Sequence, residues 1–243
     1  MQPPANTPDY RVDLDASAEV VTGSPQHGYR GDRLPAAPTD RPLSLTIAVS
    51  RETGARGASI AQMAGRKLGW QVFTQESLEY LAHEPAQREN IISQIPSELI
   101  PWVESRLAAL RQPESPAHPP SLADMAQVVL ALAAQGDVVL VGRGAGFLLP
   151  GETTLHVRIV APVADRVAYM SQRLRLTTDQ AAELVKQRDQ QRADFVATHF
   201  HRQPGAVHLY DLVLNSSLLG EELCAELIVQ AARAKKARFV PPS

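Results

Sequence analysis

Short apolar, β-branched runs alternate with longer stretches of helical period through most of this chain. The clearest runs are LSLTIAV at 43–49 and DVVLV at 137–141. The VVLV of the second run is apolar without a break, which suits a strand buried on both faces of a parallel sheet. Strands that alternate with helices are joined by right-handed crossovers. With further runs at 70–73, 154–160 and 210–214, we predict a three-layer α/β/α fold with a five-stranded parallel sheet.

The intervening stretches show the spacing of amphipathic or buried helices. The segment RQPESPAHPP at 111–120 is expected to be a loop, because its prolines cannot continue a helix. The expected helices span residues 58–68, 75–82, 122–134, 163–173, 178–197 and 219–235, with one or two more within 89–111.

The first 42 residues differ in composition from the rest. They hold 7 of the 19 prolines, charges of both signs and no sustained apolar period. Such a segment buries too little surface to offset the entropy lost on ordering. We therefore expect a disordered N-terminal tail at 1–42 and one folded domain at 43–238.

Charge and cysteine content restrict the class of protein. Lys and Arg total 24 and Asp and Glu total 26, so there is no basic excess for binding nucleic acid. Cys224 is alone, which excludes an internal disulfide and favours a reducing, cytoplasmic location. We also expect no membrane span and no secretory signal, because no long apolar run is present. The oligomeric state stays open.

A Gly-containing turn, SRETGARG at 50–57, follows the first strand and opens a helix. This context aims backbone N–H groups and the helix dipole at one point, as phosphate binding requires. Compared with G-x-x-x-x-G-K-[ST], Arg51 and Arg56 replace the two glycines, and Gly57 stands where the lysine belongs. Alternatively, the turn is an ordinary connection. The predicted nucleotide-binding residues are Arg51, Gly54, Ala55, Arg56, Gly57, Ala58 and Ser59, with the Ser59 hydroxyl as the magnesium ligand.

A second glycine turn, Gly142, Arg143 and Gly144, follows the buried strand, at the sheet edge where ligands of α/β folds bind. A single guanidinium on such a turn suits bidentate binding of a monophosphate. The alternative is that the glycines merely permit a tight turn that carries a surface arginine.

The long polar helix carries Arg188 and Arg192 four residues apart, with Asp189 adjacent. This spacing places both guanidinium groups on one face, which is mildly unfavourable unless an anion bridges them. Phosphoryl transfer to a phosphate acceptor depends mainly on charge neutralisation and alignment. We predict that these three residues are catalytic, and the alternative is a solvated charged helix.

Four segments together resemble the cytidylate kinase-like family over residues 44–235. In order along the chain, they are VSRETGARGASIAQMAGRKLGWQVF, VVLVGRGAGFLLP, the DR…RD..R stretch and YDLVLNSS. The resemblance implies a P-loop nucleoside monophosphate kinase fold with a helical lid at about 163–205. It implies ATP and Mg²⁺ as cofactors and CMP or dCMP as acceptor. It also implies that Arg143 holds the monophosphate, and that either Arg51 or Arg56 supplies the charge of the missing lysine.

Two positions depart from the related kinases. Thr74 and Tyr80 stand where those kinases have an acidic residue and a phosphate-gripping arginine, and no Asp follows DVVLV. Two alternatives therefore accompany the kinase hypothesis. One is a kinase of another small substrate, and the other is a catalytically silent nucleotide-binding module that acts through a partner.

Overall fold

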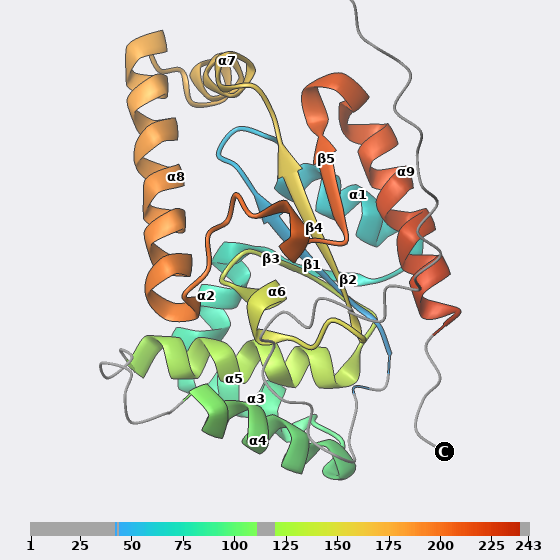
Figure 1. The fold of residues 1–243 in the computed structure, drawn as a ribbon. Coiled ribbons are helices and arrows are strands. Elements are labelled where there is room, and N and C mark those ends of the chain that lie inside the picture. Colours follow the sequence, from blue (N-terminus) through green and yellow to red (C-terminus); the bar gives the residue numbers. More distant parts are fainter. Residues whose placement is uncertain (1–41, 43, 111–119, 239–243) are drawn as a thin grey trace, which may run out of the picture. The chain divides into compact units, whose positions relative to one another are not determined.

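The structure is a computed structural model that describes residues 42, 44–110 and 120–238. Nearly all of the expected tail at 1–42 and of the expected loop at 111–120 lies outside the described residues. The described residues form one parallel sheet in the order β2-β3-β1-β4-β5 (Figure 1). This confirms the predicted sheet, whose strands are β1 (Thr46–Arg51), β2 (Gln71–Phe73), β3 (Val138–Val141), β4 (Thr154–Val160) and β5 (Leu212–Asn215).

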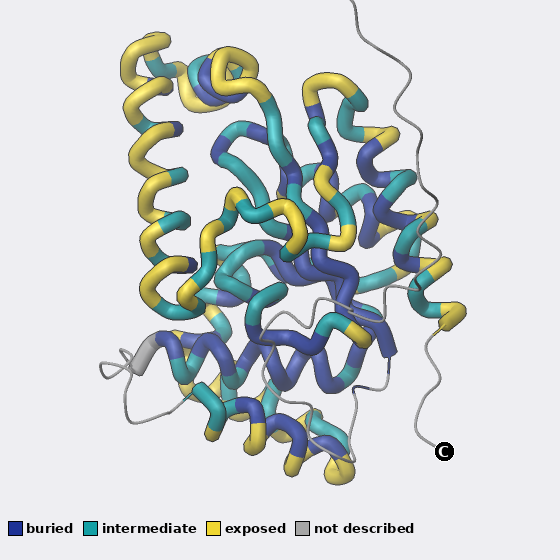
Figure 2. The backbone as a smooth tube through the Cα atoms, viewed as in Figure 1, coloured by how far each residue is buried: buried dark blue, intermediate teal, exposed yellow. Residues whose placement is uncertain are grey.

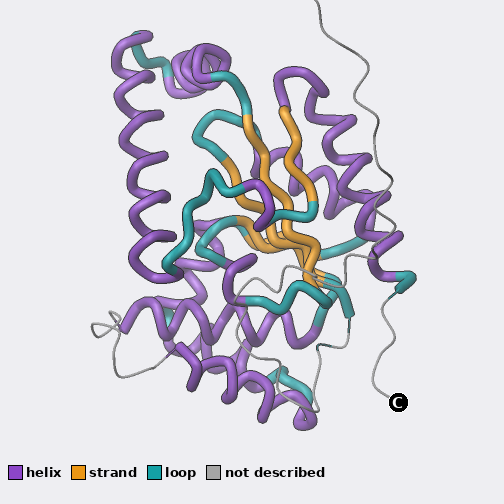
Figure 3. The backbone as a smooth tube through the Cα atoms, in the orientation of Figure 1, coloured by secondary structure: helices purple, strands orange, loops and turns teal. Residues whose placement is uncertain are grey.

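Helices cover both faces of the sheet (Figures 1 and 3). One face carries α1 (Gly57–Leu68) and α9 (Ser216–Lys236). The other carries α2 (Gln75–His83), α3 (Pro85–Ser93), α4 (Ile100–Leu110), α5 (Pro120–Gln135) and the short α6 (Ala145–Leu148). The helices α7 (Val163–Leu174) and α8 (Thr178–Phe200) lie to one side of the sheet and pack on each other, and two 3₁₀ turns lie at Ser97–Leu99 and Val207–Leu209.

Strand β3 shows why its sequence is apolar without alternation. Val138 and Leu140 pack with the α5 side of the core, whereas Val139 and Val141 pack with α1 and α9. All four side chains are buried, and the centre of the sheet is the most deeply buried part of the fold (Figure 2). A strand covered on both faces needs apolar residues at every position.

Helix α8 ends three residues beyond the predicted boundary, at Phe200. His201 takes a left-handed conformation with φ of 51° and donates its N–H to the Ala197 carbonyl, which closes the helix. The helix begins with a reciprocal hydrogen-bond pair between Thr177 and Gln180. Most of its surface is exposed (Figure 2).

The sheet order reverses the direction of the connections at β1. The chain leaves β1 for β2, two positions to one side, and leaves β4 for β5 on the other side. Ligands of open α/β sheets bind outside the carboxyl ends of strands at such a switch point. The segment of α7 and α8 joins β4 to β5, so it starts at this end of the sheet. No helix among the described residues is long and apolar enough to cross a membrane.

Candidate functional site

The loop after β1 is held on both sides by the fold. The Glu52 N–H donates to the Ile159 carbonyl at 3.0 Å, and the Ser216 hydroxyl donates to the Ala55 carbonyl at 2.9 Å. Arg56 caps α1 in a left-handed conformation, at φ of 59°. The N–H groups of the first turn of an α-helix have no intrahelical acceptor, and the helix dipole makes that end attractive to anions.

The side chain of Arg51 fills the space that Gly57 leaves open. A Cβ on Gly57 would lie 2.6 Å from the Arg51 Cβ, well inside a normal contact. Farther along the same side chain, a Cβ on Gly142 would collide with the Arg51 guanidinium. The Arg51 side chain therefore packs against both glycines, and two departures from the ordinary phosphate loop, Arg51 and Gly57, belong to one arrangement.

The half-buried Arg51 side chain lies within the electrostatic influence of other cations. Its Nη2 donates to the Gln75 side-chain oxygen at 2.8 Å. Burial first, and then the charge of Arg192, lower the Arg51 pKa to about 10, with Arg143 adding to the effect and Glu76 opposing it. Like charges held together in this way are stabilised by an anion between them.

Arg143 reaches the same region from the turn after β3. It forms an ion pair with Glu79 of α2, and its guanidinium lies 6.0 Å from the centre of the Phe195 ring. Burial lowers the Arg143 pKa, which Glu76 partly opposes. Within the described residues the Arg143 Nε is buried without a hydrogen-bond partner. The chain Arg51, Gln75, Glu79 and Arg143 is continuous, because the Gln75 amide donates to Glu79 at 2.9 Å.

Arg192 approaches the loop from α8. Its Nη2 donates to the Thr53 hydroxyl and lies 3.3 Å from an Asp189 oxygen. Burial lowers the Arg192 pKa despite the charge of Asp189, and its Nε is also buried without a partner in the described part of the chain. Arg188 is exposed and adds to the lowering of the Arg192 pKa. The two guanidinium groups expected on one face therefore differ in burial.

Asp189 binds the loop through Thr53. It accepts from the Thr53 N–H at 2.8 Å and from the Thr53 hydroxyl at 2.7 Å. Arg166 of α7, 6% exposed, donates to the other Asp189 oxygen at 2.5 Å. Sequence reasoning included Arg166 only as part of the DR…RD..R stretch that resembles the family. It gave no role to Thr53, Gln75 and Glu79, whose only signal was their position near the loop or after the second strand.

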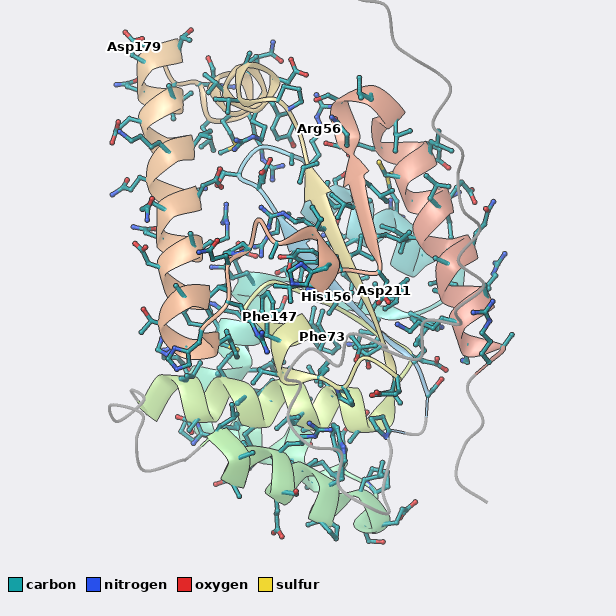
Figure 4. All side chains as sticks on the ribbon, viewed as in Figure 1. Arg56, Phe73, Phe147, His156, Asp179 and Asp211 are labelled. Carbon is teal, nitrogen blue, oxygen red and sulfur yellow. The ribbon has the colours of Figure 1, made fainter. Side chains whose placement is uncertain are left out.

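The remaining loop residues lie around this centre. Arg56, labelled in Figure 4, has other partners: its Nε lies 3.8 Å from a Glu221 oxygen, and its guanidinium lies 4.9 Å from the centre of the Tyr169 ring. Ala55 is buried and Ala58 is exposed. Ser59 lies in the first turn of α1, although a strict count against the loop pattern puts Ala58 in the hydroxyl position.

Three other positions have structural contacts. Gly54 has φ of 83° and lies against the backbone of Arg166. Gly144 caps α6 next to the Phe200 ring. Asn215 caps α9 by accepting from the N–H groups of Ser217 and Leu218.

The donor set fits a magnesium ion that arrives with a nucleotide. Among the described residues there is no group of three or more His, Cys, Asp and Glu side chains that could hold a metal by itself. Mg²⁺ in kinases keeps several waters and takes most of its other ligands from phosphates, with one or two protein oxygens. The Ser59 hydroxyl, beside the loop, can supply such an oxygen.

The five-stranded parallel sheet in the order β2-β3-β1-β4-β5, with the loop between β1 and α1, defines a fold of the P-loop kinase type. The chain belongs to the cytidylate kinase-like family, whose profile matches residues 46–218. The fold resembles an uncharacterized protein from Eubacterium ventriosum, at a TM-score of 0.57 and 15% identity over 79% of this chain and 99% of that one.

Other comparisons are weaker. A shikimate kinase from Bacteroides thetaiotaomicron gives a TM-score of 0.42 at 14% identity, over 78% of this chain and 96% of that one. The protein TT1252 from Thermus thermophilus gives 0.43 at 17%, over 78% and 97%. A uronate isomerase from Corynebacterium glutamicum is 30% identical over 107 residues, which are 44% of this chain and 21% of that protein. The chain thus spans about a fifth of this curated relative's length.

Proposed function

We propose that this protein transfers the γ-phosphoryl group of ATP to a nucleoside monophosphate, with CMP or dCMP as the preferred acceptor. The observation that carries the proposal is the convergence of Arg51, Arg143 and Arg192 beside the loop. Their mutual repulsion, together with two buried Nε donors that lack partners, creates a site that favours a polyanion. Two phosphorylated substrates brought end to end supply such a charge.

In this proposal each part of the site has one task. The loop N–H groups and Arg51 hold the β- and γ-phosphates, so that Arg51 takes the place of the missing lysine. Arg143 holds the acceptor phosphate and exchanges its ion pair with Glu79 for it. Arg192 neutralises charge on the group in transfer. Mg²⁺ bound with the nucleotide would be held in part by the Ser59 hydroxyl and would reduce the negative charge of the phosphates. A phosphate acceptor is already ionised and requires no general base.

One observation favours the silent-module alternative. Arg143 is paired with Glu79, and Asp189 takes the Thr53 N–H, so some donors at the loop have acidic partners from the protein itself. A protein of this kind can bind a nucleotide without turnover. Arg143→Ala distinguishes the two functions, since it should raise KM for the monophosphate only if that residue holds an acceptor.

The test is coupled ADP release with Mg²⁺, ATP and a panel of nucleoside monophosphates, in parallel with calorimetric ATP binding. Turnover fastest with CMP or dCMP is the expected result. ATP binding without turnover on any monophosphate would replace this function with the silent module. Turnover with another small acceptor would keep the phosphotransferase and change the substrate.

A further inference from the structure

Thr53 connects the phosphate loop to the two helices of the expected lid. Its N–H and its hydroxyl donate to Asp189 of α8, at 2.8 and 2.7 Å. Its carbonyl accepts from Arg166 of α7 at 3.2 Å. All three polar groups of this one loop residue are therefore bound by α7 and α8, and Thr53 is 5% exposed.

Most of the hydrogen-bonding capacity of the Asp189 carboxylate is used by the protein itself. Besides the two Thr53 donors, it accepts from Arg166 at 2.5 Å and from Arg192 at 3.3 Å. Each carboxylate oxygen offers about two lone-pair sites, and three of the four donors share Oδ1, while Arg166 binds Oδ2. The Oδ1 atom can contact a metal ion or a substrate only by giving up one of these bonds. This argues against a catalytic role for Asp189 and in favour of a positioning role.

Arg166 anchors the other end of the connection. Its Nε donates to the Ala161 carbonyl at 2.9 Å and lies 3.4 Å from a Glu52 oxygen. With Asp189 on Nη1, this buried cation is balanced by two carboxylates. The helix backbone also reaches the loop directly, since a Cβ on Gly54 would lie 2.6 Å from the Arg166 carbonyl oxygen. The contact thus joins α7, α8 and the loop through charge, hydrogen bonds and close packing.

We propose that Asp189 is a positioning residue that, together with Arg166, fastens α7 and α8 to the phosphate loop before any nucleotide binds. Loop and lid then behave as one unit rather than as a fixed loop with a free flap. Arg192 lies three residues after Asp189 on α8, so the same contact aims its guanidinium at the loop. This last consequence rests on the proposed function, whereas the connection itself does not.

Amide hydrogen exchange of the nucleotide-free protein, followed by mass spectrometry, tests the connection. Exchange reports local opening of hydrogen-bonded segments. We compare the wild-type protein with Asp189→Asn and with the matched control Asp194→Asn. Asp194 is an exposed carboxylate on the same helix, and it accepts a hydrogen bond from the Gln190 amide. Peptides over the loop, over residues 185–195 and over β3 are followed.

In Asp189→Asn, exchange should rise about tenfold or more in both the loop and residues 185–195, with β3 unchanged, and Asp194→Asn should match the wild type. Thr53→Val should reproduce the effect of Asp189→Asn, and Thr53→Ser should restore slow exchange because it keeps the hydroxyl. The two Thr53 variants test the same connection if Asp189→Asn does not fold. A wild-type α8 that already exchanges freely, or a change in α8 without one in the loop, would overturn the proposal. Because no nucleotide is present, these results do not depend on kinase activity.

Discussion

The Arg51 side chain lies over Gly57 and beside Gly142, and this contact explains why the loop departs from the usual lysine pattern. An ordinary phosphate loop has a glycine at the first position and a lysine at the seventh. Here Arg51, at the first position, supplies both the bulk and the charge, and Gly57, at the seventh position, has no side chain. We propose that the position of a cation relative to the loop is kept while its place in the sequence changes.

Adding a methyl group at position 57 should displace Arg51. Gly57→Ala places a Cβ 2.6 Å from the Arg51 Cβ, and such overpacking typically costs about 1–3 kcal/mol. We expect a lower free energy of unfolding and weaker ATP binding. The control is Gly205→Ala, because a Cβ there meets nothing within 4 Å. Chemical denaturation and calorimetry measure both effects, and equal behaviour of the two variants would contradict the packing argument.

In the α7 and α8 segment, some side-chain directions could be predicted from the sequence, and some contacts could not. The spacing of Arg188 and Arg192 predicted a common face, yet only Arg192 is turned toward Thr53 and the loop. Helical periodicity gives the relative direction of two side chains, but it does not say which flank of a polar helix meets another element. The role of Arg166 could not be predicted, because its partners Thr53 and Asp189 are distant in sequence.

The core and the loop also differ in how far the sequence predicts them. The apolar run of β3 and the strand boundaries of β4 were predictable, since burial on both faces leaves a clear pattern. The position of the Arg51 side chain was not, because it depends on Gly142, which contacts Arg51 from the turn after β3. Arg56 instead faces Glu221 and Tyr169.

The difference between Arg188 and Arg192 should appear in kinetics. Arg192→Ala should lower kcat on the order of a hundredfold, as loss of a preorganised donor does, with little change in ATP affinity. Arg188→Ala should have a smaller effect, because that side chain is exposed. Steady-state rates and calorimetry on both variants check this. Equal losses would favour the original expectation that both guanidinium groups act together.

The Asp189 contact should make lid stability depend on pH. Burial alone would raise the Asp189 pKa, but the hydrogen bonds from Thr53 and the contact with Arg166 outweigh it, so the pKa is lowered. A carboxyl group with a lowered folded pKa stabilises the protein above its unfolded pKa of about 3.9. That contribution is lost as the pH falls through the folded value.

We therefore expect Asp189→Asn to be less stable than the wild type at pH 7, with the gap closing in acid below about pH 4. Urea denaturation at a series of pH values measures the gap. A gap that stays constant down to the acid limit would show that the charge of Asp189 contributes nothing. Asp194→Asn, on the exposed side of the same helix, should give no gap at any pH.

Considered as a whole molecule, the domain combines two core clusters on opposite faces of the sheet with a third, smaller cluster between α7 and α8. The two large clusters hold the strands, and the loop joins them to the lid. All of these elements lie after residue 42. If the expected boundary at residue 42 is right, the tail can be removed without loss of the folded domain.

Deletion of residues 1–42 should leave cooperative unfolding and ATP binding nearly unchanged, because the expected tail contributes little apolar surface. Thermal unfolding of the truncated chain, with and without ATP and Mg²⁺, measures this. Loss of a cooperative transition would show that the first 42 residues belong to the domain.

The measurement closest to the central claim is calorimetric binding of ATP with Mg²⁺ to three proteins: the wild type, Arg51→Gly, and Arg51→Gly combined with Gly57→Lys. If Arg51 takes the place of the loop lysine, Arg51→Gly should weaken ATP binding about tenfold or more, in line with the loss of a charged hydrogen bond. The double variant, which restores the ordinary loop pattern, should regain most of the affinity. Wild-type protein that does not bind ATP, or Arg51→Gly that binds it as tightly as the wild type, would contradict the account.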